Sequence, residues 1–263
     1  MTPSPQALAD EYLKALDECR SEQFYQEFIE SNTRLVPREF IQNHGIHFDL
    51  VFRKLAFGAD YKSDFVYLSK SSDDWNCVLV EIERPDVAFF DGNSNEFSRP
   101  FQHALQQIND WKAWFLNAAN KAAFIDSQLR FVRTPLFQNP TYLKYVLVYG
   151  RRSEYAANDL RRAKIAALES ADFKVLSFDS LGEALHTKEN LYIAAKRNEY
   201  VEILSDTFIS ETMFGWMPPE QIAISQTLKA DALAKRSGWH HIRALSPKTY
   251  VMDRALAGVR IRA

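Results

Sequence analysis

The chain lacks the features that mark several large classes of protein. Its 263 residues include only two cysteines, Cys19 and Cys77, which lie far apart in the sequence. This spacing matches no zinc motif and provides no disulfide framework, so we expect two reduced thiols. No apolar run reaches the roughly 18 residues of a membrane-spanning helix, and the stretch MTPSPQALADEYL has no basic segment followed by an apolar one. We therefore expect a cytoplasmic protein that does not cross a membrane.

A large excess of one charge is also absent, because 32 Lys and Arg stand against 34 Asp and Glu. The distribution of charge is more informative, since residues 221–263 contain eight Lys and Arg but only two Asp. Basic faces of this kind attract a phosphate backbone. A solvated basic surface, or contact with an acidic partner subunit, explains them equally well. A second basic cluster comprises Arg151, Arg152, Arg161, Arg162 and Lys164.

Hydrophobic periodicity predicts an α/β chain. The composition, with 46% hydrophobic and 25% charged residues, is that of a globular protein. Residues 6–31 place apolar side chains at helical spacing, in two helices. Three segments with the side-chain pattern of strands follow and are separated by tight turns: HFDLVFRKLAF, SDFVYLSK and CVLVEIE. These three strands are predicted to form an antiparallel meander.

The second half of this pattern alternates helices and strands. Pro100 opens a strong helix over 101–124, and the buried strand LKYVLVYG follows it. An amphipathic helix over 154–171, the strand FKVLSFD and the short helix SLGEALHTK come next. This βαβ-like order predicts strands that extend the sheet in a parallel or mixed manner. The predicted fold is α/β, a mixed central sheet flanked by helices.

Three regions are predicted along the chain. Residues 1–20 form an N-terminal helix, residues 21–189 the main domain, and residues 190–263 a C-terminal helical extension or subdomain. Within the last region, YIAAKRNEYVEILSDTFIS and PPEQIAISQTLKADALAKRSG are predicted to be helices.

The stretch NCVLVEIERPD is an apolar strand that ends in two acids, Glu81 and Glu83. Side chains two apart on a strand share a face, so both carboxylates point the same way. Lys62 and Asp64 have the same spacing on the preceding strand, and pairing of the two strands would bring Asp64 near Glu81. Close, partly buried carboxylates repel and need a compensating cation or a shifted pKa. Their hard oxygens suit Mg²⁺ or Mn²⁺, which activate water for attack on a phosphate.

Plainer interpretations exist for these residues. Glu81 and Glu83 could cap an exposed strand end and pair with Lys or Arg, a surface interaction that contributes little to stability. Arg151 and Arg152 follow the strand YVLVYG, and arginine forks bind phosphate oxygens well. They are therefore candidates for DNA-backbone contacts, and the alternative is ion pairing with Glu154 or with a neighbouring helix.

Six segments occur in order along the chain: QEFIESN, ADYKSDFVYL, VLVEIERP, HALQQINDWKAWF, YVLVYGRR and FKVLSFDSL. Together they resemble the Shedu anti-phage nuclease family, which belongs to the PD-(D/E)xK phosphodiesterase superfamily. The resemblance covers roughly residues 20–185. It implies a restriction-endonuclease-like core, so that residues 21–189 form a PD-(D/E)xK nuclease-like domain. The α-β-β-β-α-β order fits that core independently.

The resemblance also implies roles for individual residues. Asp64 and Glu81 match the two motif acids and would hold Mg²⁺, or Mn²⁺ in its place, with help from the Ile82 carbonyl. Glu83 stands where the family pattern usually has lysine, and a carboxylate there serves as a further metal ligand or as a general base. Gln107 matches the Gln-rich helix motif and would orient the water or a phosphate, unless it is a solvated helix residue.

Two positions stay open at this stage. Lys62 shares a face with Asp64 and either takes the place of the missing lysine or is an ordinary surface residue. The acid expected on the first core helix is Glu27 or Glu30.

The resemblance therefore implies a metal-dependent endonuclease that hydrolyses DNA in defence against phage and assembles as a homo-oligomer. A catalytically inactive nucleic-acid-binding or sensing module that retains the fold is the alternative. A structural oligomerisation protein, which would bind neither metal nor DNA, is a third interpretation.

Overall fold

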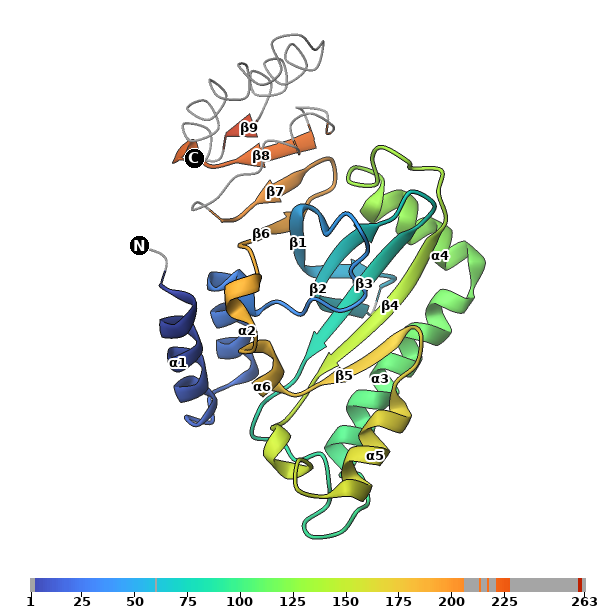
Figure 1. Ribbon diagram of the computed structural model, residues 1–263. Coiled ribbons are helices and arrows are strands. Elements are labelled where there is room, and N and C mark those ends of the chain that lie inside the picture. The colour runs from blue at the N-terminus through green and yellow to red at the C-terminus, as the bar shows by residue number, and fades with distance from the viewer. Residues whose placement is uncertain are drawn as a thin grey trace.

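The chain folds into a central mixed sheet with helices on both faces, as the computed structural model in Figure 1 shows. Within the described residues, nine strands lie in the order β5-β4-β3-β2-β1-β6-β7-β8-β9. The predicted α/β fold, a mixed sheet flanked by helices, is confirmed. The structure describes residues 3–59, 61–205 and 221–227, positions 213 and 217, and the backbone of 260–261.

The first five strands match the predicted meander and βαβ order. β1 (Ile46–Phe57), β2 (Tyr61–Lys70) and β3 (Trp75–Ile82) pair antiparallel in turn. β4 (Thr141–Val148) lies parallel to β3, and β5 (Phe173–Leu176) lies parallel to β4. Because each parallel connection contains a helix, the chain crosses one face of the sheet before it enters the next strand.

One face of the sheet carries the N-terminal helices. α1 (Pro5–Leu16) and α2 (Glu22–Ser31) begin after Ser4 and Ser21, whose hydroxyls accept hydrogen bonds from backbone N–H groups of the first turn. Their apolar sides pack with the short α6 (Phe178–Leu181) against the sheet. The two predicted N-terminal helices are confirmed.

The opposite face carries α3 (Arg99–Leu116), α4 (Ala118–Phe124) and α5 (Asp159–Leu168). The single helix predicted over 101–124 breaks at Asn117, whose side chain caps the N-terminus of α4. A π-helical turn, η2, follows α4. The bounds of η2 and of the three 3₁₀ turns are Ile125–Leu129, Thr33–Leu35, Arg152–Glu154 and Leu185–Thr187.

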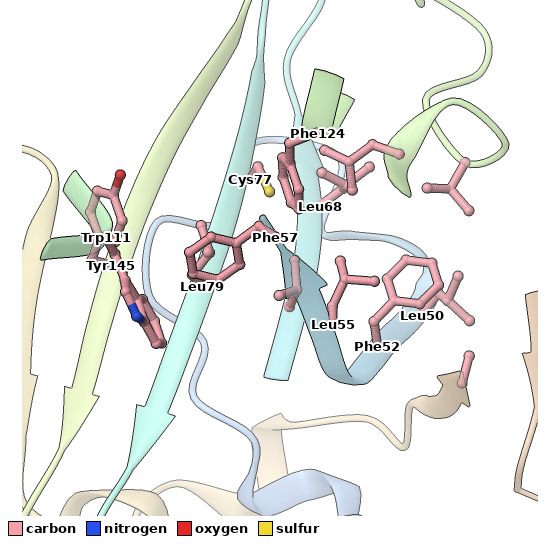
Figure 2. Packing of buried hydrophobic residues seen from close by; sticks show 14 of the residues in the cluster. Leu50, Phe52, Leu55, Phe57, Leu68, Cys77, Leu79, Trp111, Phe124 and Tyr145 are labelled. Carbon is pink, nitrogen blue, oxygen red and sulfur yellow. The ribbon is translucent and has the colours of Figure 1, made fainter. Parts of the chain in front are cut away.

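Strand alternation divides the core into two layers. Cys77 and Leu79 of β3 face the α3–α4 side, where Figure 2 shows them near Phe57 and Phe124. Val78 and the other even-numbered residues of β3 face α1 and α2. Odd-numbered positions on β3 therefore point towards α3, and this direction decides where Glu81 lies.

Both cysteines are free thiols. Cys19 is exposed, whereas Cys77 is fully buried, and burial raises the pKa of the Cys77 thiol to about 12. Among the residues that the structure describes, no helix combines the length and the apolar character needed to cross a bilayer.

The predicted C-terminal helices are wrong for the part of them that the structure describes. In place of a helix over 192–210, β6 (Tyr192–Lys196) pairs parallel with β1, and β7 (Val201–Ile203) returns antiparallel to β6. Short apolar runs carry too few residues for periodicity to distinguish a strand from a helix. The unpaired edge of β1 decides the outcome, because it offers backbone hydrogen-bond partners to the following chain.

Two further strands, β8 (Ile222–Ile224) and β9 (Arg260–Ile261), continue the sheet in parallel pairs. The rest of the helix predicted over 218–238, and most of the basic segment 221–263, lie outside the described residues. The boundary at residue 190 stays a prediction.

Candidate active site

Two of the acids predicted from the sequence, Asp64 and Glu81, lie opposite each other on β2 and β3, and Glu83 comes directly after β3. The register of β2 and β3 pairs Phe65 with Val80, which places Asp64 across from Glu81 on the neighbouring strand. Glu83 follows β3 by one residue, and its backbone N–H still donates to the carbonyl of Val148 on β4. The predicted proximity of Asp64 and Glu81 is therefore confirmed.

Asp64 is almost completely buried, with only 2% of the residue exposed. Its Oδ2 accepts a hydrogen bond of 2.8 Å from the backbone N–H of Ile82, and its Oδ1 forms an ion pair with the Lys54 ammonium. A buried carboxylate needs such partners, because an isolated charge in a protein interior is very unfavourable. The two contacts hold the Asp64 carboxylate in a defined orientation beside Glu81.

Glu81 lies against α3. Gln107 of that helix donates from Nε2 to Glu81 Oε1 at 2.6 Å, while Glu81 Oε2 is shielded from solvent and has no hydrogen-bond partner. Burial and the negative charge of Asp64 raise the pKa of Glu81 well above its ordinary value, and the hydrogen bond from Gln107 acts in the opposite direction. A shielded carboxylate oxygen without a partner is a strained arrangement that a bound cation would relieve. Gln107 therefore contacts Glu81 rather than solvent alone, and its role in the site stays a prediction.

A fourth carboxylate comes from the first turn of α2. Burial, together with repulsion from Glu22 and then Asp64, raises the pKa of Glu83 to about 7. In the same way burial and then Asp64 raise the pKa of Glu22. Ser21 caps α2 and fixes the point at which this turn begins, so the helix presents Glu22 to the other acids.

The two acids proposed for the first core helix, Glu27 and Glu30, have other hydrogen-bond and ion-pair partners, and a role for either at the site stays a prediction. Glu27 accepts a hydrogen bond from Gln23 at an exposed site, and Glu30 pairs with Arg53 at 2.9 Å. The helix carboxylate that interacts with Asp64 and Glu83 is Glu22. Sequence reasoning missed it because Glu22 belongs to the first turn of α2, and only the packing of that turn against the end of β3 brings it to the site.

Lys54, which the sequence did not single out, supplies the positive charge at the site. Lys62 is exposed and lies opposite Ala56 of β1, and the lysine that pairs with Asp64 is Lys54 of β1. Desolvation lowers the pKa of Lys54, yet its hydrogen bond with Asp64 and the attraction of the surrounding acids outweigh this effect and raise it. Lys54 therefore occupies the cationic place beside Asp64, whereas a role for Lys62 stays a prediction.

The backbone at Lys54 explains how it reaches the site. Its φ of 46° lies in the left-handed region, which is unfavourable for a residue with a Cβ atom and recurs at functional sites. Core-facing side chains fall on Phe52 and then on Leu55, so the strict alternation of β1 breaks between them. Two consecutive basic residues, Arg53 and Lys54, consequently avoid the core. The sequence FRKL carries this signal, because two charged residues separate two apolar ones in a strand.

Arg151 and Arg152 take part in ion pairs within the chain. Arg151 contacts Asp179 at 3.0 Å, and the backbone N–H of Arg152 donates to the same carboxylate at 2.7 Å, while its guanidinium pairs with Glu183. Arg151 also pairs with Asp17 at the end of α1, at 2.9 Å. These partners match the alternative of a neighbouring helix rather than Glu154. Contact of these arginines with DNA stays a prediction.

The acids fit a divalent cation in charge and in donor chemistry. Asp64 and Glu81 offer hard carboxylate oxygens, and Glu81 Oε2 is shielded and unpartnered. The Lys54 ammonium already lies against Asp64 Oδ1, so a positive charge is stable beside this carboxylate. Among the described residues, no three His, Cys, Asp or Glu side chains converge closely enough to form a complete metal site. The two facing carboxylates are therefore the part of a metal site that the described side chains offer.

We expect the free energy of unfolding of the chain to fall as the pH rises through the pKa of Glu83. The pKa of Glu83 is about 7 in the folded chain against an ordinary value of 4.5, so the folded state binds more protons between these values and the free energy of unfolding decreases with rising pH. Glu83→Gln should remove this contribution and raise the free energy of unfolding at about pH 8 by on the order of 2 kcal/mol. Near pH 4.5 the two proteins should be equally stable.

Urea unfolding with a chelator present, at several pH values, measures this effect. Glu27→Gln removes the same charge from an exposed position of α2 and serves as the matched control. An equal change in both variants at high pH would contradict a raised pKa at Glu83.

A family model described as Shedu protein SduA, C-terminal, matches residues 20–181, more than half of the chain. The matched segment contains Glu22, Asp64, Glu81 and Gln107, and it coincides with the six segments of the sequence resemblance. The resemblance is therefore confirmed. Comparison with curated proteins gives no match.

Proposed function

The chain belongs to the Shedu family, and on this premise we propose that it is a metal-dependent endonuclease that hydrolyses phosphodiester bonds of DNA. Membership of the family implies a role in defence against phage. One observation carries the proposal: Asp64 and Glu81 face each other in a buried site that holds an unpartnered carboxylate oxygen and an ammonium group. The PD-(D/E)xK chemistry expected from the resemblance belongs to this proposal.

We propose that Asp64, Glu81 and the Ile82 carbonyl bind Mg²⁺, or Mn²⁺ in its place. When bound, the ion supplies a Lewis acid that polarises the phosphate and lowers the pKa of a bound water. Gln107 keeps the Glu81 carboxylate in place through its 2.6 Å hydrogen bond. Support for this assignment comes from the excess of negative charge, which needs a cation beyond Lys54.

Glu83 is proposed as the general base. A carboxylate with a pKa of about 7 is a much better proton acceptor at neutral pH than an ordinary glutamate. In hydrolysis it would remove a proton from the attacking water while the phosphorus–oxygen bond to the leaving group breaks. Its role as a further metal ligand is the alternative that remains from the sequence.

Lys54 is proposed to take over the part that a lysine plays at the position of Glu83 in the family pattern. Its side chain is 39% exposed and pairs with a nearly buried carboxylate, so its ammonium borders both the acids and the solvent. Positive charge at this border stabilises the negative charge that develops on the phosphate. The position of Lys54 therefore supports the proposal of activity in a chain that carries Glu83 where the family pattern usually has lysine.

A nicking assay on supercoiled plasmid tests the proposed function. Wild-type protein should nick or linearise the plasmid with Mg²⁺ or Mn²⁺, and a chelator should abolish cleavage. If no metal supports cleavage but the protein binds the plasmid, the inactive nucleic-acid-binding module is the better description. Absence of both binding and cleavage would favour a structural oligomerisation protein.

The oligomeric state is a separate expectation that rests on the family alone. We propose a homo-oligomer that acts in the cytoplasm, where phage DNA is exposed. Light scattering coupled to size exclusion measures the mass in solution, and a mass of 30.4 kDa would contradict the expectation.

A further inference from the structure

A cavity of about 690 Å³ opens directly beside Lys54. Its size is typical of a ligand site, which commonly measures about 300–1,000 Å³. The lining residues described by the structure include four cations and no acid, and we call this cavity the cationic cleft. Its polar lining residues are Arg53, Lys54, Ser127, Gln128, Lys196, Arg197 and Asn198.

Three separate elements build the cationic cleft. The break in alternation on β1 turns both Arg53 and Lys54 away from the core. Parallel pairing of β1 with β6 ends at Phe52 and Ala194, immediately before these residues, so the turn between β6 and β7 lies next to them. β6 contributes its last residue, Lys196, and the turn contributes Arg197.

The third wall is the π-helical turn η2. It contributes Ser127 and Gln128. π-helical turns are rare and recur at functional sites, because they reorient side chains relative to the helix that they interrupt. The cleft therefore combines an unusual helix geometry with the left-handed backbone of Lys54.

The cations of the cleft are held by partners that leave them at its wall. Arg53 pairs with Glu30 at 2.9 Å, and Arg197 pairs with Glu202 at 2.6 Å. The Lys196 ammonium donates to the carbonyl of Asn198 at 3.1 Å and lies 4.5 Å from the centre of the Phe131 ring. These contacts fix the side chains in place, and fixed cations bind an anion with a smaller loss of conformational entropy.

We propose that the cationic cleft binds the phosphate backbone of the DNA next to the bond that is cut. The proposal rests on the function proposed above and extends it from the reacting phosphate to the path of the strand. Lys54 belongs both to the cleft and to the ion pair with Asp64, so a backbone held in the cleft leads to the acids. Arginine and lysine are the side chains that bind phosphate oxygens.

This placement competes with Arg151 and Arg152. Each of those arginines pairs with an acid that belongs to α6 or follows it, and the described structure places neither in the cavity beside Lys54. The two basic pairs differ in position but carry the same charge. A direct comparison of the two pairs therefore tests the location of the DNA without changing the net charge between variants.

Two double variants, Lys196→Gln/Arg197→Gln and Arg151→Gln/Arg152→Gln, provide the test. Binding of a fluorescein-labelled DNA duplex is measured by anisotropy over a range of salt concentrations, with a chelator present so that no cleavage occurs. We expect the cleft variant to bind about tenfold more weakly, with a slope of log K against log salt that is smaller by about 2, since each phosphate contact contributes about 0.9. The other variant should retain the affinity and slope of the wild type.

Ser127→Asp tests the opposite wall without removing any ion pair. Ser127 is exposed, so the change leaves the fold intact, and a negative charge there should weaken binding whereas Ser127→Asn should not. Melting temperatures identify any variant that fails to fold.

Loss of binding in the Arg151/Arg152 variant alone would overturn the placement, and so would an equal loss in both double variants. The wild type could cut plasmid while Lys196→Gln/Arg197→Gln and Ser127→Asp both leave the affinity for DNA unchanged. In that case the cleft proposal fails and the proposed function stands. A wild type that neither binds nor cuts DNA would overturn both.

Discussion

Replacing Glu81 with glutamine is expected to slow metal-dependent DNA cleavage by about a thousandfold. The substitution keeps an oxygen that can accept the hydrogen bond from Gln107, but it removes the negative charge proposed to hold the cation. Loss of charge stabilisation from a metal ion is worth several kcal/mol in the transition state, and each 1.36 kcal/mol changes the rate about tenfold. The initial rate of plasmid nicking at saturating Mg²⁺ measures the effect.

The same variant should not be less stable than the wild type. Burial and Asp64 raise the pKa of Glu81 well above its ordinary value, so the charged form is unfavourable in the folded chain and a neutral side chain should raise the melting temperature at about pH 8. Glu96→Gln, at an exposed position of the loop before α3, is the control for both measurements. Unchanged nicking in Glu81→Gln would refute the site assignment, and a lower melting temperature would refute the electrostatic argument.

Replacing Lys54 with methionine is the second change with a large expected effect. Removing one group that stabilises the charge of a transition state commonly costs about 10²–10³ in rate, and Lys54 is the cation beside Asp64. We expect most of the loss in kcat, because the ammonium is proposed to act on charge that develops during the reaction, and a smaller rise in KM, because Lys54 also lines the cationic cleft. Lys62→Met, an exposed lysine on β2, is the matched control and should retain the rate of the wild type.

Stability separates this role from a purely structural one. Without Lys54 the buried Asp64 loses the charge that compensates it, so the variant should be less stable when a chelator is present. A divalent cation should restore much of that stability, because it supplies charge at the same carboxylate. Full activity of Lys54→Met, or a loss of stability that Mn²⁺ leaves unchanged, would contradict the proposed role.

The position of Lys54 changes the significance of Glu83. The sequence indicates a carboxylate where a lysine is usual in the family, and this departure raises the question of whether the chain retains activity. In the structure an ammonium group approaches Asp64 from β1 instead, while Glu83 lies among acids that raise its pKa to about 7. We propose that Lys54 stabilises negative charge on the phosphate and that Glu83 removes the proton from water, two roles that a single lysine would otherwise fill.

Much of the fold followed from local patterns. Strand alternation and turn residues predicted β1 to β3 and the pairing that brings Asp64 to Glu81, and helical spacing placed Gln107 within α3. These features depend on neighbours within a few residues, which a sequence displays directly. The predicted helix over 101–124 differed only by its break at Asn117.

The C-terminal strands show where such reasoning ends. β6 and β7 are five and three residues long, and segments of this length satisfy helical and strand periodicity equally well. Their conformation depends on the free edge of β1, which lies more than a hundred residues earlier in the chain. Pairing over such a separation leaves no local signal.

By itself, the sequence determined the order of the elements from α1 to β5, the proximity of Asp64 and Glu81, and the family to which the chain belongs. Only the tertiary structure decided that Glu22 joins these acids and that Lys54, not Lys62, pairs with Asp64. The physical reason is the same in both cases. Periodicity specifies the face on which a side chain lies, whereas the packing of α2 and the left-handed backbone of β1 specify which charges meet across elements.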